Sequence, residues 1–346
     1  MFAMQQIVLA GGGCMGAMHA KVYRLLPDAC IAAVVDPRGE RVLEGLCADA
    51  NVPVFPDLAA ALERVECSAV DICLPTDLHR ETALLALAAG KHVFCEKPIA
   101  LTREDAAAMT AAAQSAGLQM MVGHCIRFWP EYLELKRAVD SGEYGRLVSL
   151  SMDRRTGRPG YSIGNWVNRP ERCLGAALDL HIHDTDFLLH LLGCPEAVVS
   201  QGLRDETGWS SISTQYVYAQ RIVVAEGAWN YPEKWGFQMR FHAVFERGVL
   251  EFDSSAKDTL MLTAGDSSAA AVRLPEPSGM SPAVREQIAS LGGYYHELDY
   301  FVDCLERGEP VAISTGAQAA ESLALVLAEI ESAASGKIIT LKKSSS

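Results

Sequence analysis

Asp179, His183 and Asp186 stand four and three residues apart in a segment rich in histidine and aspartate. On one continuous helix, side chains with this spacing share a face. A carboxylate there can orient an imidazole, and the imidazole can accept a hydroxyl proton. The spacing therefore predicts an acid–base pair, His183 with Asp179. A solvated helix face is one alternative. A metal site that also used His181 and Asp184 is another, but the acidic groups do not all share the face of His183, and we expect no metal.

A lysine that could assist the same chemistry lies in Glu96-Lys97-Pro98, directly after an apolar segment with the pattern of a buried strand. In open parallel sheets, ligands bind beyond the carboxyl ends of the strands. An ammonium group placed there can hydrogen-bond a substrate hydroxyl and stabilise a developing alkoxide. A lysine on a surface loop is the alternative interpretation. Pro98 allows a cis peptide bond at this position.

A glycine-rich turn near the start of the chain is typical of a dinucleotide site. Gly11, Gly13 and Gly16 satisfy the pattern G-x-G-x-x-G, with Cys14 and Met15 between the last two glycines. Such glycines permit a tight turn, close approach of the backbone to a pyrophosphate, and close packing of helix on strand. The start of the following helix offers free N–H groups to the anion. The motif is weak by itself and depends on its context.

That context includes an acidic residue at the end of the next predicted strand. Asp36 stands 20 residues after Gly16, where a carboxylate can accept hydrogen bonds from both ribose hydroxyls of an adenosine. A carboxylate also repels a 2′-phosphate, so the sequence favours NAD over NADP. Arg38 weakens this preference, because an arginine can bind that phosphate. A turn-forming aspartate before Pro37 is the alternative.

The elements that must position these groups alternate regularly in the first third of the chain. Short apolar runs bounded by Gly, Pro or Asp alternate with Ala/Leu-rich segments of helical period, which predicts a doubly wound parallel sheet. Thr102 and Asp105 predict a helix N-cap. The predicted strands are Gln6–Ala10, Ile31–Asp36, Val52–Phe55, Ala69–Leu74, His92–Cys95 and Gln119–Gly123. The predicted helices are 15–26, 38–49, 57–64, 77–89 and 102–117.

After residue 125 the pattern changes to a mostly β one, with strands of period two. We expect an α+β domain with an open, mostly antiparallel sheet and helices on one face. The domains predicted are therefore 1–124, which binds NAD(P), and 125–346. The predicted strands are 146–155, 197–202, 211–219, 221–229, 239–246, 248–253 and 259–263, with a tight hairpin at Glu246-Arg247-Gly248. The predicted helices are 129–141, 176–192, 293–307 and 315–335.

Composition excludes several classes of protein. The chain has 346 residues, of which 49% are hydrophobic, enough for two domains with their own cores. A formal net charge of -13 argues against a nucleic-acid partner and against an anionic membrane surface. The first ten residues lack the basic start of a secretory signal, and the ten cysteines form no C-x-x-C pair. We expect a cytoplasmic protein with reduced thiols.

With these residues in place, the chain resembles the glucose–fructose oxidoreductase, inositol dehydrogenase and rhizopine-catabolism (Gfo/Idh/MocA) family along nearly its whole length. The most specific run is AGKHVFCEKPIA, within DICLPTDLHRETALLALAAGKHVFCEKPIA at 71–100. The other runs are GGGCMGAMHA at 11–20, VVDP at 34–37, GHCIRFWPEYLELKRAVDSGEYG at 123–145 and GAALDLHIHDTDFLLHLLG at 175–193. The chain departs from the family's frequent Gly-Gly-Gly at Cys173-Leu174-Gly175-Ala176, and has Cys125 where Asn is frequent. These departures put the substrate in doubt.

The resemblance implies an NAD-dependent oxidoreductase that moves hydride to or from a secondary alcohol or ketone of a sugar or an inositol-like polyol. It implies that His183 is the acid–base residue, with Asp179 and Lys97 beside the substrate. It also implies a homodimer or homotetramer formed through the C-terminal sheet. The further residues that it suggests are Arg127 and Trp166 for the substrate, and Pro75, Thr76, His79 and Glu96 for the cofactor; His19 is expected to be structural.

Two other functions remain open on the same residues. One is a glycoside-cleaving enzyme that keeps NAD bound and oxidises the sugar transiently. The other is a non-catalytic regulator that senses a nucleotide on the same scaffold. A regulator need not retain Lys97, Asp179 and His183, and all three are present in the chain.

Overall fold

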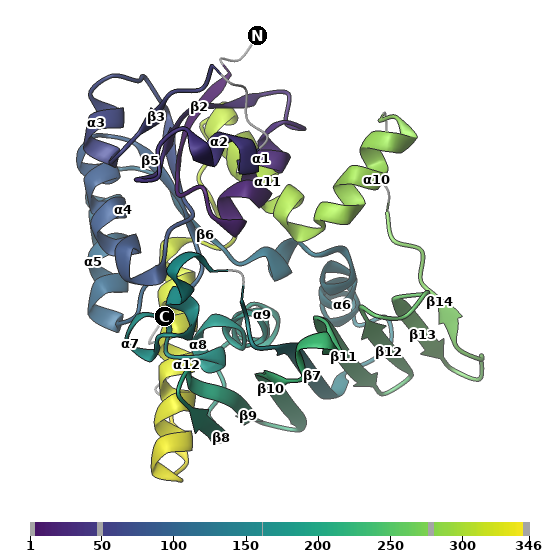
Figure 1. The fold of residues 1–346 in the computed structure, drawn as a ribbon. Helices are drawn as coiled ribbons and strands as arrows, with labels where there is room; N and C mark the ends of the chain where they lie inside the picture. The colour runs from purple at the N-terminus through teal and green to yellow at the C-terminus, as the bar shows by residue number, and fades with distance from the viewer. Residues whose placement is uncertain (1–3, 47–50, 161, 276–279, 342–346) are drawn as a thin grey trace. The chain divides into compact units, whose positions relative to one another are not determined.

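The computed structural model describes residues 4–46, 51–160, 162–275 and 280–341, which form two compact units. Neither unit is continuous in sequence. The first comprises Met1–Phe128, Tyr161–Trp166 and Pro277–Leu323, and the second comprises Trp129–Gly160, Val167–Glu276 and Ala324–Ser346. Each unit is built around one sheet (Figure 1).

The sheet of the first unit has six parallel strands in the order β3-β2-β1-β4-β5-β6, which confirms the predicted doubly wound sheet. The order reverses between β1 and β4, and the carboxyl ends of strands at such a point form the ligand crevice of open α/β sheets. The strands are β1 (Gln5–Ala10), β2 (Ala29–Val35), β3 (Val54–Phe55), β4 (Ala69–Ile72), β5 (His92–Glu96) and β6 (Met120–Gly123).

Helices cover both faces of this sheet, which explains why its strands are mostly apolar. Residues 7–10 of β1, for example, are completely buried. One face carries α1 (Cys14–Tyr23), α2 (Arg41–Leu46) and α11 (Gly293–Arg307), and the other carries α3 (Leu58–Leu62), α4 (His79–Ala88) and α5 (Arg103–Ala116) (Figure 1). Thr102 caps α5 as predicted, because its hydroxyl accepts the Asp105 N–H at 3.1 Å. Residues 47–49 of the predicted helix 38–49 lie outside the described residues.

The C-terminal part of the chain completes the first unit. On α11, Leu298 and Phe301 are fully buried against Ile7 and Phe94 of the sheet. The helix α10 (Pro282–Leu291) was not predicted from the sequence. Its start has a clear local signal, because the Ser281 hydroxyl accepts the Val284 N–H and proline occupies the first turn.

The sheet of the second unit has nine strands in the order β14-β13-β12-β11-β7-β10-β9-β8-β15. Of the strand pairs in the described part of this sheet, β7–β10 is parallel and the others are antiparallel, so the predicted open, mostly antiparallel sheet is confirmed. Glu246 and Arg247 form the predicted two-residue hairpin, since Phe245 pairs with Gly248. The strands are β7 (Leu147–Gly157), β8 (Ala197–Asp205), β9 (Gly208–Tyr218), β10 (Arg221–Tyr231), β11 (Gln238–Phe245), β12 (Gly248–Asp253), β13 (Leu260–Ala264), β14 (Ala270–Ala271) and β15 (Ile339–Thr340).

The prediction of a single helix over 176–192 is wrong. The structure has α8 (Ala176–Asp179) and α9 (Ile182–Leu192), with a turn at residues 180 and 181. The His181 N–H donates to the Ala176 carbonyl at 2.8 Å, a spacing of five residues that interrupts the regular ladder. The two helices lie on the same side of the sheet as α6 (Pro130–Ser141) (Figure 1).

The remaining helical elements are short, except for one that contributes residues to both units. The helix α12 (Gly316–Ser335) contributes residues 316–323 to the first unit and 324–335 to the second. The short elements are η1 (Thr76–Leu78), η2 (Cys125–Phe128), η3 (Ile163–Asn168), α7 (Pro170–Cys173) and η4 (Glu233–Trp235). Every cysteine in the described ranges is a free thiol, and none of the described helices has the length and apolar character that crossing a bilayer requires.

Candidate functional site

The glycine turn joins β1 to α1, and its backbone leaves room for a ligand at one position. Gly11 has φ +103°, and a Cβ atom there would lie 2.5 Å from the Cys73 carbonyl oxygen. A Cβ atom at Gly16 would overlap the carbonyl oxygen of Gly11. At Gly13 such a Cβ would have, among the described residues outside its chain neighbours, only Ile163 Cδ1 within 4 Å, at 3.9 Å. Two glycines therefore permit close packing, and the third leaves the backbone open for a pyrophosphate.

The helix α1 begins directly at this opening. Cys14 and Met15 form its first turn, and no side chain caps it. The first N–H groups of an uncapped helix, together with the positive end of the helix dipole, favour an anion. The turn thus has the backbone geometry that a dinucleotide phosphate requires.

Asp36 follows β2 and faces the same turn. Its carboxylate accepts the Gly12 N–H at 2.9 Å and is bound by the Arg38 guanidinium at 2.8 and 2.7 Å. Burial alone would raise the pKa of Asp36, but the hydrogen bonds from Arg38 and Gly12 outweigh it and hold the pKa below its usual range. Asp36 is therefore an ionised acceptor beside the glycine turn. Arg38 is held by Asp36 and also donates to the Gly12 carbonyl at 2.9 Å.

A second group of the predicted cofactor residues lies after β4. Pro75 precedes η1, Thr76 is buried in it, and His79 begins α4 with no exposed surface. One ring nitrogen of His79 lies 2.8 Å from the Leu74 carbonyl oxygen, and the other lies 2.9 Å from that of Pro98. Burial lowers the pKa of His79. This imidazole therefore ties the loop after β4 to the loop after β5.

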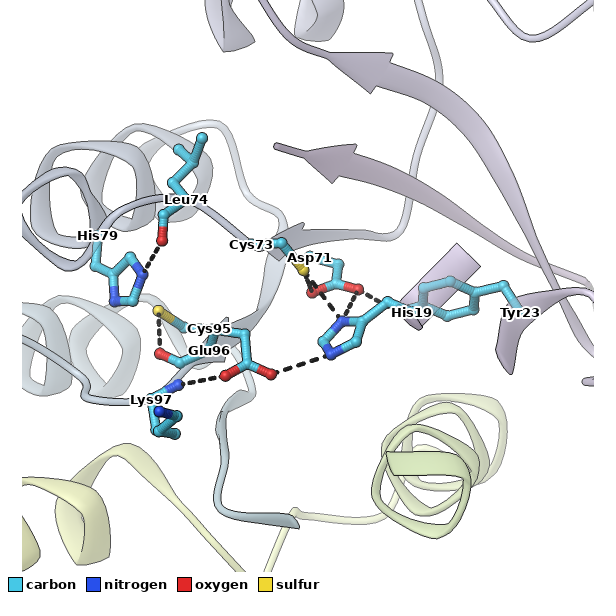
Figure 2. A network of polar contacts seen from close by, with 9 residues as sticks. All are labelled: His19, Tyr23, Asp71, Cys73, Leu74, His79, Cys95, Glu96 and Lys97. Carbon is cyan, nitrogen blue, oxygen red and sulfur yellow. Dashed lines mark hydrogen bonds and ion pairs between the residues drawn. The ribbon is translucent and has the colours of Figure 1, made fainter. Parts of the chain in front are cut away.

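Glu96 and Lys97 lie at the carboxyl end of β5, as Figure 2 shows. The Glu96 carboxylate accepts the Lys97 N–H at 3.0 Å with Oε2, and its Oε1 lies 3.1 Å from His19 Nε2. The Lys97–Pro98 peptide bond is cis, as Pro98 allowed. Lys97 itself is half-buried. The buried carboxylate of Glu96 thus fixes the main chain that carries the lysine.

His19 links this end of β5 to β4 and was predicted only as a structural residue. Its Nδ1 lies 2.8 Å from Asp71 Oδ2, which also accepts the Tyr23 hydroxyl at 3.0 Å (Figure 2). Burial would lower the pKa of His19, but the Asp71 carboxylate outweighs it and raises the pKa well above its usual value. Sequence reasoning missed Asp71. Its signal was a charged residue inside an otherwise apolar strand.

In the second unit, Asp179 is the last residue of α8 and His183 is the second residue of α9. Each is 8% exposed, so both are buried but reach the surface of the unit. Because the helix is interrupted between them, the expectation that both project from one continuous helix face is wrong. Asp186 is on α9 with His183 and is completely buried.

The other histidine and the other aspartate of this segment, His181 and Asp184, point into the unit. His181 Nε2 lies 2.7 Å from Glu329 Oε2, and both side chains are completely buried. Asp184 accepts two hydrogen bonds from Arg154, at 3.0 and 2.9 Å. These two residues therefore anchor α9, which argues against the four-residue metal site considered from the sequence.

Two further predicted substrate residues belong to the first unit. Arg127, in η2, is 3% exposed and donates to Gln318 Oε1 at 2.6 Å. Trp166, in η3, is half-buried. The predicted set is thus divided, with Lys97, Arg127 and Trp166 in the first unit and Asp179 and His183 in the second.

Comparison with known proteins agrees with this geometry. A family described as "Oxidoreductase family, NAD-binding Rossmann fold" matches residues 5–124, and the "GFO/IDH/MocA C-terminal domain" matches residues 132–251. The chain belongs to the Gfo/Idh/MocA oxidoreductase family. The resemblance stated from the sequence is thereby confirmed.

Named relatives of this family match most or part of the chain. Inositol 2-dehydrogenase of Rhizobium meliloti (strain 1021) is 25% identical over 345 residues, covering 96% of this chain and 98% of that protein. The 2,7-anhydro-N-acetylneuraminate hydratase of Escherichia coli (strain K12) is 32% identical over 197 residues, but the match spans only 51% of that protein and 56% of this chain. A levoglucosan dehydrogenase solved with NADH and levoglucosan has the same fold, with a TM-score of 0.84 at 20% identity over 98% of this chain and all of that one.

Proposed function

We propose that the protein transfers hydride between NAD and a secondary alcohol or ketone of a sugar or inositol-like polyol. The observation that carries the proposal is the ionised Asp36 beside the open backbone of Gly13, in a chain of the NAD-binding oxidoreductase family. The substrate class is supported by the names of relatives, which include an inositol 2-dehydrogenase and a levoglucosan dehydrogenase.

The residues around the glycine turn fit a dinucleotide. Gly11, Gly13 and Gly16, with the first turn of α1 at Cys14 and Met15, would hold the pyrophosphate. Asp36 would accept the ribose hydroxyls, and its negative charge would disfavour the 2′-phosphate of NADP. Arg38 is bound to Asp36 at 2.7 Å, so its charge is already compensated. Pro75, Thr76, His79, Glu96 and Lys97 complete the proposed cofactor set.

When bound, NAD supplies the carbon that exchanges hydride with the substrate. For the protein, we propose that His183 accepts the hydroxyl proton as the alcohol is oxidised and returns it in the reverse direction. Asp179 orients the substrate and His183. The Lys97 ammonium stabilises negative charge on the reacting oxygen. Arg127 and Trp166 complete the proposed substrate contacts.

Three further assignments belong to the same proposal. Residues 1–124 would form the NAD-binding domain, and 125–346 the substrate and oligomerisation domain. The protein would act in the cytoplasm, where reduced cysteines persist. It would form a homodimer or homotetramer through the nine-stranded sheet.

The test is a panel of inositols and monosaccharides with NAD and with NADP, followed by absorbance of the reduced cofactor. We expect turnover with NAD and at least one polyol. His183→Asn should lower kcat by about 10²–10⁴-fold, as for loss of a general acid–base group. His242→Asn, on β11 with a half-exposed side chain, is the matched control and should leave kcat unchanged. Full activity of His183→Asn would contradict the assigned role.

A second function deserves the same panel, because one relative is named a hydratase and not a dehydrogenase. In a glycoside-cleaving enzyme, NAD would be reduced and reoxidised within one turnover. Such an enzyme would be purified with the cofactor bound and would release a leaving group without net NADH. Ready loss of the cofactor on dialysis would exclude this alternative.

A further inference from the structure

Glu297 of α11 lies against the His19 network of the first unit, which consists of His19, Tyr23, Asp71, Cys73 and Glu96. Glu297 is completely buried, and neither of its carboxyl oxygens has a hydrogen-bond partner among the described residues. One of these oxygens, an oxygen of Glu96 and a ring nitrogen of His19 all lie within 4.8 Å of one another. An ionised carboxylate that is buried without a donor is strongly destabilising.

The charges of the network identify which group must be neutral. Both ring nitrogens of His19 face carboxylate oxygens, of Asp71 and Glu96, so His19 can donate to both only as an imidazolium. Asp71 also receives the Tyr23 hydroxyl, and Glu96 receives the Lys97 N–H. With three ionised carboxylates, one imidazolium would leave two excess negative charges around it, and the Lys97 ammonium near Glu96 would offset at most one of them.

We propose that Glu297 is a neutral carboxylic acid and that His19, Asp71 and Glu297 are positioning residues that hold Glu96, and through it Lys97, in place. Burial and the nearby Glu96 raise the pKa of Glu297 well above its usual value, in agreement with the geometry. The part that concerns turnover rests on the proposed function, while the part that concerns protonation and hydrogen bonding does not.

The arrangement couples two parts of the site through one helix. The start of α1 faces the glycine turn, and His19, within the same helix, reaches Glu96. Glu96 in turn fixes the Lys97 main chain at 3.0 Å. A displacement of α1 would therefore move the proposed pyrophosphate site and the lysine together. Errors of about 1 Å in such positions can cost about 100-fold in rate.

The protonation of Glu297 is tested first, without any substrate. Infrared spectra of the full-length protein with NAD should contain the carbonyl stretching band of a buried protonated carboxyl group. Glu297→Gln should remove this band. An unchanged spectrum would overturn the proposal. So would one equivalent of a divalent metal in the purified protein that is lost in Glu297→Gln, because the carboxyl group would then be an ionised ligand.

The positioning of Lys97 is tested by hydrogen exchange of its main-chain amide. Glu96→Ala, which removes the acceptor of the Lys97 N–H, should speed this exchange by about tenfold, the factor expected when one hydrogen bond is lost. His19→Gln, which removes the imidazole that holds Glu96, should also speed it. The matched control is His92→Gln, the same substitution at the other end of β5, where the imidazole accepts the Gln119 N–H at 3.0 Å. Unchanged exchange at Lys97 in both test variants would overturn the proposal.

Kinetics then distinguish positioning from general support of the fold. In His19→Gln, which leaves every residue of the proposed cofactor set in place, we expect kcat to fall by about 100-fold, while the Kd for NAD changes by less than about threefold. Equal losses of kcat and NAD affinity would indicate a merely structural role and overturn the assignment. If wild-type protein turned over no polyol, the proposed function would fail, whereas infrared and exchange results would still decide the inference.

Discussion

Each unit of the protein buries a histidine against carboxylate side chains, but the two histidines lie in different electrostatic surroundings. In the first unit, His19 lies between Asp71 and Glu96, with Glu297 nearby. Carboxyl groups there outnumber the single imidazole. The stability of this network therefore depends on which of its groups carry protons. The network lies at the carboxyl ends of β4 and β5, where ligands of open parallel sheets bind.

In the second unit, one carboxylate has several donors. Glu329 bonds His181 at 2.7 Å and accepts the hydroxyls of Thr185 and Thr214 at 3.0 and 3.1 Å. The Tyr216 hydroxyl lies 2.9 Å from that of Thr185. Most of these donors are neutral, so the network holds α9 in place through packing and hydrogen bonding. The neighbouring Arg154–Asp184 pair, by contrast, is a full buried ion pair.

We infer that the first network determines the charge of the groups at the proposed site, and that the second network holds the helix α9 in position. Substitutions that change charge should therefore act most strongly in the first unit, except at Arg154. Substitutions that remove one neutral donor should have small effects in the second. The following experiments test this difference, from the largest expected effect to the smallest.

Arg154→Met should have the largest effect on stability. It leaves Asp184 charged in a fully buried position, which costs about 3–5 kcal/mol of the free energy of unfolding. The double variant Arg154→Met/Asp184→Leu should recover most of this loss, because no buried charge remains. Urea unfolding followed by tryptophan fluorescence is a suitable measurement, since all tryptophans except Trp166 belong to the second unit. A double variant as unstable as the single one would contradict this explanation.

The same substitution at the two histidines compares the networks directly. His19→Gln removes a cation between two carboxylates and should cost about 3 kcal/mol, the value of one to two hydrogen bonds to charged groups. His181→Gln should cost about 1–2 kcal/mol, because an amide can still donate to Glu329 and the threonine hydroxyls remain. Hydrogen exchange with peptide resolution would assign each loss to its unit. Equal losses would remove the difference proposed between the networks.

The sheet of the first unit could be predicted from sequence patterns because each of its strands is specified by residues that are close together in the chain. Runs such as Ile7–Ala10 are apolar throughout and end at glycine, so their burial follows from a few neighbouring residues. The glycine turn and Asp36 were predicted for the same reason. The pattern of Thr102 and Asp105 likewise located the start of α5, with the predicted hydrogen bond.

What could not be predicted depends on partners far away in the sequence. The break between α8 and α9 accompanies the burial of His181 on Glu329, which is 148 residues away. The spacing of Asp179 and His183 therefore suggested a continuous helix that the fold does not form. His19 and Asp71 are 52 residues apart, and no local pattern connects either of them to Glu297. The roles of Lys97, Asp179 and His183 stay predictions until kinetics tests them.

The pH dependence of stability sharpens the comparison through Glu297, which faces His19, Glu96 and Asp71. Its raised pKa means that the folded protein retains a proton above pH 4.5, where the unfolded chain has released it. Stability is then lost as pH rises from 4.5 towards the folded pKa, by up to about 1.4 kcal/mol per pH unit. Glu297→Gln should remove this slope, and Glu309→Gln, exposed after α11, should not.

His19 adds a slope of the same sign in a different pH range. Because its pKa is raised, its contribution is present below pH 6.5 and is lost as pH rises through the folded pKa. Asp36 and Glu96 act oppositely, since their lowered pKa values make stability fall in acid. The same three groups titrate in wild type and in Glu297→Gln, so the difference between the two curves reports Glu297 together with its electrostatic interactions with Glu96 and His19. Parallel curves between pH 4.5 and 6.5 would mean that Glu297 is ionised in the folded protein.

Thr185→Val should have the smallest effect and tests the second network. Valine has nearly the shape of threonine but lacks the hydroxyl that bonds Glu329 and Tyr216. Since His181 and Thr214 still donate to Glu329, we expect a loss of about 1 kcal/mol in the free energy of unfolding, with no change in its pH dependence. Urea unfolding at several pH values measures both. A pH-dependent loss would show that the second network is as sensitive to charge as the first.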